Sequence, residues 1–130
     1  MKPLTIGDSE FKGIIEDGFY YVEKTPFIKE ILDNFKGTKL FLRPRRFGKT
    51  TNMFMLKEYF DITRKEENIN LFKGLYIDSL GEEYKKQQNA YTVIFMSLKR
   101  VKQDTWEVMY DKFMDIIIDV YGANEYDKSV

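Results

Sequence analysis

A chain of 130 residues is long enough for one domain with a real core, but small for a complete nucleotide-binding α/β domain. Its 21 basic and 21 acidic side chains balance, so the net charge gives no reason to expect a dedicated nucleic-acid binder. Without cysteine or histidine, the sequence excludes disulfides, thiolate or imidazole metal ligands, cysteine nucleophiles and Ser-His-Asp catalysis. It has neither an apolar signal segment at the N-terminus nor a run of ~18 apolar residues, so we expect a cytoplasmic protein.

Residues 1–38 form a lead-in segment in this interpretation. A short helical stretch is expected around 11–16, followed by an aromatic, β-prone strand or extended stretch at 19–22. Thr25 and Pro26 predict the start of a helix, with Thr25 as its N-cap and Pro26 in the first helical position. Apolar side chains at helical spacing carry this helix to about residue 34, and a glycine soon after it favours a stop.

The central motif occupies residues 39–60. Residues 39–42 are predicted to form a short buried strand, residues 43–51 a basic, turn-prone loop, and residues 52–60 a helix. Strand, loop, Gly-Lys-Thr and helix is the context in which a phosphate-binding P-loop is expected.

The residue types of this loop suit a nucleoside triphosphate. Gly48 allows a close backbone approach and a positive φ, Lys49 places an ammonium against the β- and γ-phosphates, and the Thr50 hydroxyl completes a Mg²⁺ site. The candidate nucleotide-binding residues are Arg45, Arg46, Phe47, Gly48, Lys49, Thr50 and Thr51, with Thr50 also as metal ligand. Arg43 stands where the general motif has its first glycine, and Pro44 has no N–H to donate, so fewer backbone donors can face the phosphates.

A plain structural role for the same residues stays open at this point. Gly48 can serve as a turn residue, Thr50 or Thr51 as an N-cap, and the arginines as a solvated surface patch.

Residues 61–130 follow the motif. The stretch 61–70 is predicted to be a solvated connection or short helix, and 80–89 a charged helical stretch. Residues 92–98 are β-branched and apolar and predict a central parallel strand, with Ser97 at its carboxyl end but not counted as a site residue. The fold class expected from these elements is therefore α/β and P-loop NTPase-like, with an incomplete parallel sheet flanked by helices.

The last predicted element is an amphipathic helix from Thr105 or Trp106 to Tyr121. Asp104 is a candidate cap, and Gly122 is expected to end the helix.

The octapeptide at residues 43–50 resembles the P-loop of the AAA-ATPase-like family, which characteristically carries Arg-Pro-Arg-Arg-Phe-Gly-Lys-Thr at this point. Residues 19–28 are similar to the family's "YYVDKTxFI" segment, with Glu23 where Asp is usual. Residues 71–75 and 89–99 also look like family stretches. The resemblance implies an ATPase-like domain that is commonly followed by a nuclease-like domain of the PD-(D/E)XK superfamily. Only that nuclease-like domain would be expected to bind nucleic acid.

A Walker B strand, which would hold Mg²⁺, is not expected in this chain. Residues 116–119 have its apolar-run-then-Asp form, and residues 125–128 echo the family's "DEYDKP". The helical stripe runs through 116–119, however, and Asn124 replaces the first acid of the echo. We therefore expect an N-terminal ATPase-like fragment, residues 1–130, that lacks Walker B and the nuclease-like domain.

The sequence therefore predicts binding of ATP and Mg²⁺, without assigning a catalytic residue, and leaves hydrolysis by this chain alone uncertain. Two alternatives remain. One is a nucleic-acid module in which Arg43, Arg45, Arg46 and Lys49 grip backbone phosphates, and the other is a vestigial scaffold without a ligand.

Overall fold

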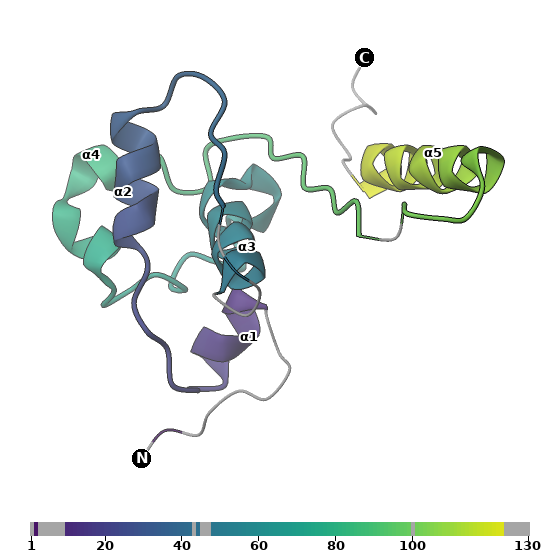
Figure 1. The fold of residues 1–130 in the computed structure, drawn as a ribbon. Helices are drawn as coiled ribbons and strands as arrows, with labels where there is room; N and C mark the ends of the chain where they lie inside the picture. Colours follow the sequence, from purple (N-terminus) through teal and green to yellow (C-terminus); the bar gives the residue numbers. More distant parts are fainter. Residues whose placement is uncertain (1, 3–9, 43, 45–47, 100, 124–130) are drawn as a thin grey trace. The chain divides into compact units, whose positions relative to one another are not determined.

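The computed structural model describes residues 2, 10–42, 44, 48–99 and 101–123 (Figure 1). It divides the chain into two units, Met1–Val93 and Ile94–Val130. The helices are α1 (Phe11–Glu16), α2 (Pro26–Asp33), α3 (Lys49–Phe60), the 3₁₀ turns η1 (Ile62–Arg64) and η2 (Tyr76–Leu80), α4 (Glu82–Lys85) and α5 (Trp106–Ala123). All of them except α5 lie in the first unit.

The core of the first unit is built by side chains from segments far apart in the sequence. Phe11 of α1 stacks on Phe72 with ring centroids 5.3 Å apart, and Tyr59 of α3 meets Phe72 edge-on at 5.1 Å. The buried hydrophobic cluster comprises Phe11, Ile28, Met55, Tyr59, Leu71, Phe72 and Ile77. Burial of this aromatic and aliphatic surface stabilises the unit.

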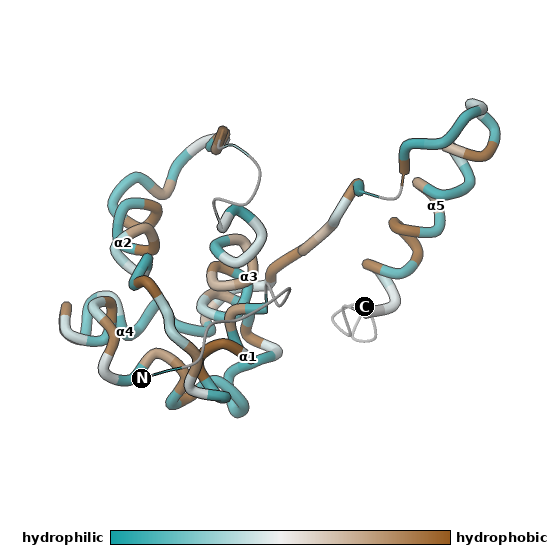
Figure 2. Tube along the Cα trace, turned by 60° about the horizontal axis from the view of Figure 1, so that its bottom comes forward, coloured by the Kyte–Doolittle hydropathy of each residue, from teal (hydrophilic) through white to brown (hydrophobic). Residues whose placement is uncertain are grey.

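The predicted α/β fold is wrong. No strand forms in residues 10–42, 48–99 and 101–123, where an isolated parallel bridge joins Asp61 to Tyr91. Residues 39–42 and 92–98, expected as buried parallel strands, have no regular secondary structure. The apolar runs in both segments are plain in Figure 2, and their patterns were the basis of the strand predictions.

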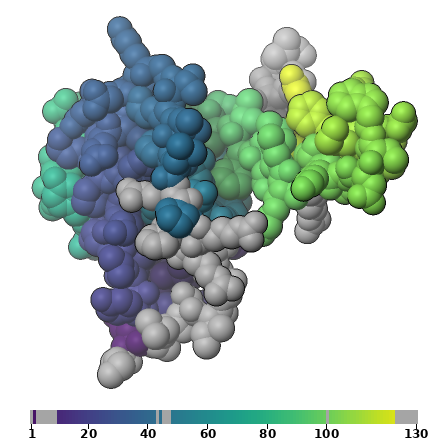
Figure 3. Space-filling view, viewed as in Figure 1, coloured from purple at the N-terminus to yellow at the C-terminus, as the bar shows by residue number. Residues whose placement is uncertain are grey.

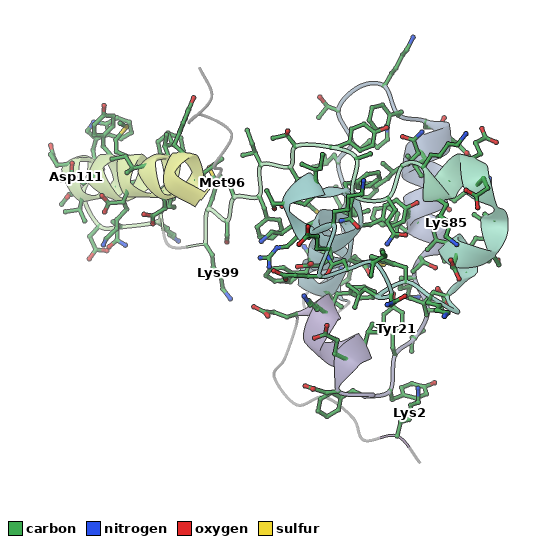
Figure 4. The ribbon with its side chains drawn as sticks, turned by 180° about the vertical axis from the view of Figure 1, so that it is seen from behind. Lys2, Tyr21, Lys85, Met96, Lys99 and Asp111 are labelled. Carbon is green, nitrogen blue, oxygen red and sulfur yellow. The ribbon has the colours of Figure 1, made fainter. Side chains whose placement is uncertain are left out.

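The physical reason is that a strand needs a neighbour. Backbone N–H and C=O groups of an extended segment are satisfied by a second strand, and the described chain lays none beside these segments. Their side chains are accordingly exposed rather than buried. Leu40 and Leu42 are each 80% exposed, and Ile94 is 69% exposed. Met96, labelled in Figure 4, is also exposed.

The predicted start of α2 is confirmed, but not the expected cap. Pro26 is the first residue of α2, and the Thr25 side chain makes no capping hydrogen bond. Instead, the fully buried Thr25 Oγ1 donates to the Glu23 carboxylate and accepts from the Ile77 N–H at 3.2 Å. Glu23 Oε1 also accepts from the Tyr76 N–H at 3.2 Å. The lead-in segment is thereby fixed to η2.

The C-terminal end of α3 is closed by polar side chains from later segments. Asn68 Nδ2 donates to the Glu58 carbonyl at 3.0 Å, and Asn89 Nδ2 donates to the carbonyls of Glu58 and Asp61 at 2.9 and 2.7 Å. Both asparagines are buried. A helix leaves its last carbonyls without intrahelical donors, so these side chains satisfy groups that burial would otherwise penalise.

The second unit contains α5. The predicted helix is confirmed, and it includes residues 116–119, which agrees with the rejection of a Walker B strand there. Two details of the prediction are wrong. Thr105 rather than Asp104 provides the side-chain hydrogen bond at the start of α5, where its Oγ1 accepts from the Val108 N–H at 3.4 Å. Gly122, which was expected to end the helix, lies inside it. Among the described residues, no helix is long and apolar enough to cross a membrane.

Candidate functional site

The described part of the predicted phosphate loop begins at Gly48. Gly48 has φ 73° and ψ 19°, the left-handed conformation, and α3 starts at the next residue, Lys49. This is a conformation that glycine takes at little cost and other residues rarely adopt. The positive φ agrees with the conformational freedom that the motif assigned to this residue.

The first turn of α3 is open to an anion. It contains no acidic residue, and Gly48 supplies no capping side chain. The Asn52 N–H donates to the Gly48 carbonyl at 2.9 Å, while the preceding N–H groups of the turn have no intrahelical acceptor. Together with the helix dipole, these groups favour negative charge at this end of α3.

The side chains of the site residues differ in exposure. Lys49 and Thr50 are exposed and Thr51 is half-buried. Arg45, Arg46 and Phe47 lie outside the described residues, as does Arg43, so their predicted roles at the site remain predictions.

An open cavity of about 410 Å³, here called the α2–α3 hollow, lies beside this helix start. Its lining comes from α2, from the start of α3 and from the segments next to them: Glu23, Lys24, Pro26, Phe27, Glu30, Phe41, Lys49, Asn52 and Met53. In Figure 3, α2 and the segment that follows it, coloured dark blue, lie on the same face as the described start of α3. Lys49 is the residue that the predicted phosphate site and the hollow share.

Aromatic side chains form part of the wall of the α2–α3 hollow. The rings of Phe27 and Phe41 meet edge-on, with centroids 4.6 Å apart and an interplanar angle of 80°. Phe41 is 41% exposed, so much of its surface remains accessible.

The two carboxylates of the hollow differ in their surroundings. Glu23 is held by Thr25 and by the Tyr76 N–H, so it has a structural role in the fold. For the Glu30 carboxylate, the structure records no hydrogen bond or ion pair with another described residue.

A partly buried tyrosine near Glu23 is kept neutral. Burial is the main cause that raises the pKa of Tyr21 to about 12, with a smaller contribution from the nearby Glu23 charge. Its hydroxyl accepts from the Lys24 N–H at 3.0 Å and donates to Met55 Sδ at 3.4 Å. Tyr21, labelled in Figure 4, thus connects the lead-in segment to α3.

A metal site made by protein side chains alone is not present in the described residues, since no group of three acidic side chains comes together there. In phosphate sites Mg²⁺ takes one or two protein ligands, phosphate oxygens and water. The exposed Thr50 hydroxyl in the first turn of α3 suits one of these positions.

The sequence interpretation missed the hollow. The sequence pattern predicts apolar side chains on the helix that starts at Pro26, but it does not indicate Phe27, Glu30 or Phe41 as site residues. The spacing of Pro26, Phe27 and Glu30 places them on one face of α2, which is a signal visible in the sequence. What that face looks onto could not be derived from spacing.

A family model described as "Predicted AAA-ATPase" matches residues 5–129. The chain is also similar to a protein of Azotobacter chroococcum mcd 1 described as "Uncharacterized protein in vnfD 5'region", with 42% identity over 78 residues. That match covers 58% of this chain and 14% of the relative, so the chain spans only a small part of the relative's length. No solved structure matches the chain.

Proposed function

The chain belongs to the AAA-ATPase-like family, and we propose that it binds the triphosphate of ATP at the start of α3. The observation that carries the proposal is the left-handed Gly48 directly before an acid-free first helical turn that begins with Lys49. This arrangement gives an anion both unpaired N–H groups and a positive side chain.

Each residue has a separate role in this proposal. Gly48 keeps the loop backbone close to the phosphates, and the Lys49 ammonium neutralises their charge. Thr50 supplies its hydroxyl to Mg²⁺, which the phosphate oxygens and water also coordinate. Thr51, Arg45, Arg46 and Phe47 form the rim, and the last three enter the proposal from the sequence motif alone.

The proposal concerns binding and assigns no catalytic residue. It places the chain in the cytoplasm, where ATP is abundant.

A nucleic-acid backbone is a weaker candidate for the same residues. In the α2–α3 hollow, Lys24 and Lys49 are balanced by the carboxylates of Glu23 and Glu30, so it offers no net positive surface to a chain of phosphates crossing it. A nucleic-acid clamp also has no use for a hydroxyl that binds Mg²⁺.

Titration of a fluorescent ATP analogue, with and without Mg²⁺, tests the proposal. Lys49→Ala should weaken binding by about ten- to a hundredfold, because a charge-assisted hydrogen bond to a phosphate is lost. The matched control is Lys65→Ala, which removes one exposed positive charge from the turn after η1 and should leave binding unchanged.

Three results contradict the proposal. Wild-type chain that binds no triphosphate at millimolar concentration would indicate a scaffold without a ligand. If wild type and Lys49→Ala bind the ATP analogue with equal affinity, the phosphate site does not lie at the start of α3. Binding that is indifferent to Mg²⁺ and is competed by single-stranded DNA at low salt would favour the nucleic-acid alternative.

A further inference from the structure

The α2–α3 hollow has the size and lining of a small-molecule site. Its volume of about 410 Å³ falls within the range of about 300–1,000 Å³ typical of ligand pockets. Phe27, Phe41, Pro26 and Met53 give it apolar surface, and the other five lining side chains are polar, four of them charged. This mixture suits a flat, partly apolar group that carries hydrogen-bond donors.

The charges that line the hollow decide which end of a nucleotide it can take. Lys24 and Lys49 balance Glu23 and Glu30, so the hollow offers no net positive charge to phosphates. Glu30 offers acceptors only, and its charge repels phosphate. Phosphates are therefore favoured at the acid-free start of α3, and an uncharged group with N–H donors is favoured in the hollow.

The aromatic wall favours a planar ring. A base can stack on the accessible surface of Phe41, whose edge-on contact with Phe27 holds it in place. Because Lys49 lines the hollow and also begins α3, a ligand with its phosphates at α3 can extend its base into the hollow.

We propose that the α2–α3 hollow binds the adenine base of the nucleotide, with the ring against Phe41 and the exocyclic amino group donating to the Glu30 carboxylate. This inference rests on the proposed function, since the phosphates must be held at residues 48–51. It adds a base-recognition site formed by α2 and the segment before the phosphate loop.

The experiment compares four probes by isothermal titration in Mg²⁺: ATP, GTP, purine riboside triphosphate, which lacks the exocyclic amino group, and inorganic tripolyphosphate. Wild type should bind ATP about tenfold or more tightly than tripolyphosphate, because base stacking adds affinity. Phe41→Ala should remove most of that difference and leave tripolyphosphate binding unchanged. Phe41 is 41% exposed and lies outside the buried hydrophobic cluster, so this variant should fold, and a cooperative thermal transition would verify it.

Glu30→Ala tests the amino-group contact. The variant should weaken the binding of ATP by about five- to tenfold, which corresponds to the loss of one hydrogen bond to a charged group. It should leave the affinity for purine riboside triphosphate unchanged. Glu82→Ala, which removes an exposed carboxylate from α4 outside the hollow, is the matched control and should change neither.

The outcomes separate this inference from the proposed function. If ATP and tripolyphosphate bind equally well, the hollow does not bind the base, while the phosphate site stands. If Glu30→Ala weakens both triphosphates alike, the amino-group contact is wrong. If GTP binds more tightly than ATP, the assignment to adenine is overturned. If no probe binds, both proposals fail.

Discussion

The side-chain amide of Asn89 donates a hydrogen bond of 2.9 Å to the backbone carbonyl of Glu58, 31 residues earlier in the chain. The same amide donates to the Asp61 carbonyl, and Asn89 holds a positive φ of 50° to do so. One residue thus satisfies the end of α3, the helix whose other end carries the proposed phosphate site.

Replacing Asn89 should destabilise the first unit for two separable reasons. Asn89→Gly loses the amide and should lower the free energy of unfolding by about 1–3 kcal/mol, because the carbonyls of Glu58 and Asp61 each lose one of their two donors. Asn89→Ala should cost about 1 kcal/mol more, because alanine resists a positive φ. Urea denaturation measures both. Asn34→Ala, which removes an exposed bond to Glu30 at the end of α2, is the control, and an equal loss there would contradict the prediction.

Thr25 should be required for its hydroxyl and not for its shape. Thr25→Val leaves the buried Ile77 N–H without an acceptor and removes one of the two donors to the Glu23 carboxylate, so the free energy of unfolding should fall by about 1–3 kcal/mol. Thr25→Ser keeps the oxygen and should retain most of the stability. The midpoint temperatures of thermal unfolding of the two variants, compared with that of wild type, test this prediction. A loss in Thr25→Ser as large as that in Thr25→Val would contradict the prediction, because it would show that the methyl group matters as much as the hydroxyl.

Substitutions of Gly48 should be harmful because of its backbone conformation and not because a side chain lacks room there. A Cβ there would meet no atom of the described structure within 4 Å, but φ is +73°. Gly48→Ala should therefore cost about 1–2 kcal/mol in stability and weaken binding of the ATP analogue. Gly48→Asn should do less harm to stability, because asparagine enters the left-handed region more readily. Equal stability losses would argue against the backbone explanation.

The Mg²⁺ dependence of binding should depend on Thr50. Thr50→Ala should leave affinity for the ATP analogue without Mg²⁺ nearly unchanged and reduce the gain on adding Mg²⁺. Thr50→Ser keeps the hydroxyl and should preserve that gain. An unchanged response to Mg²⁺ in Thr50→Ala would exclude this hydroxyl as a ligand.

Stability should fall in alkaline solution, in part through Tyr21. Its pKa is about 12 in the folded chain and 10.0 in the unfolded chain, so folding favours the neutral form. The contribution is complete below pH 10 and is lost as the pH rises from 10 towards 12, where the unfolded state gives up its proton first. Urea midpoints at pH 9 and 11 should fall less steeply for Tyr21→Phe than for wild type. Parallel curves would contradict the prediction.

The sequence by itself determined the features that depend on neighbouring residues. The helical stretch at 11–16, the start at Pro26 and the helix through 116–119 all follow from local spacing and caps, and all appear in the structure. The family assignment likewise came from contiguous motifs, because a motif is a local pattern.

Only the tertiary structure decided where distant groups meet. The apolar runs at 39–42 and 92–98 predicted strands, but a strand exists only where another segment pairs with its backbone, and the run itself does not specify that partner. The bonds of Thr25 to η2 and of Asn89 to the end of α3 are equally non-local. Phe41 and Glu30 come to line one hollow with Lys49 because the chain folds α2 and the start of α3 around it, an arrangement that no spacing in the sequence encodes.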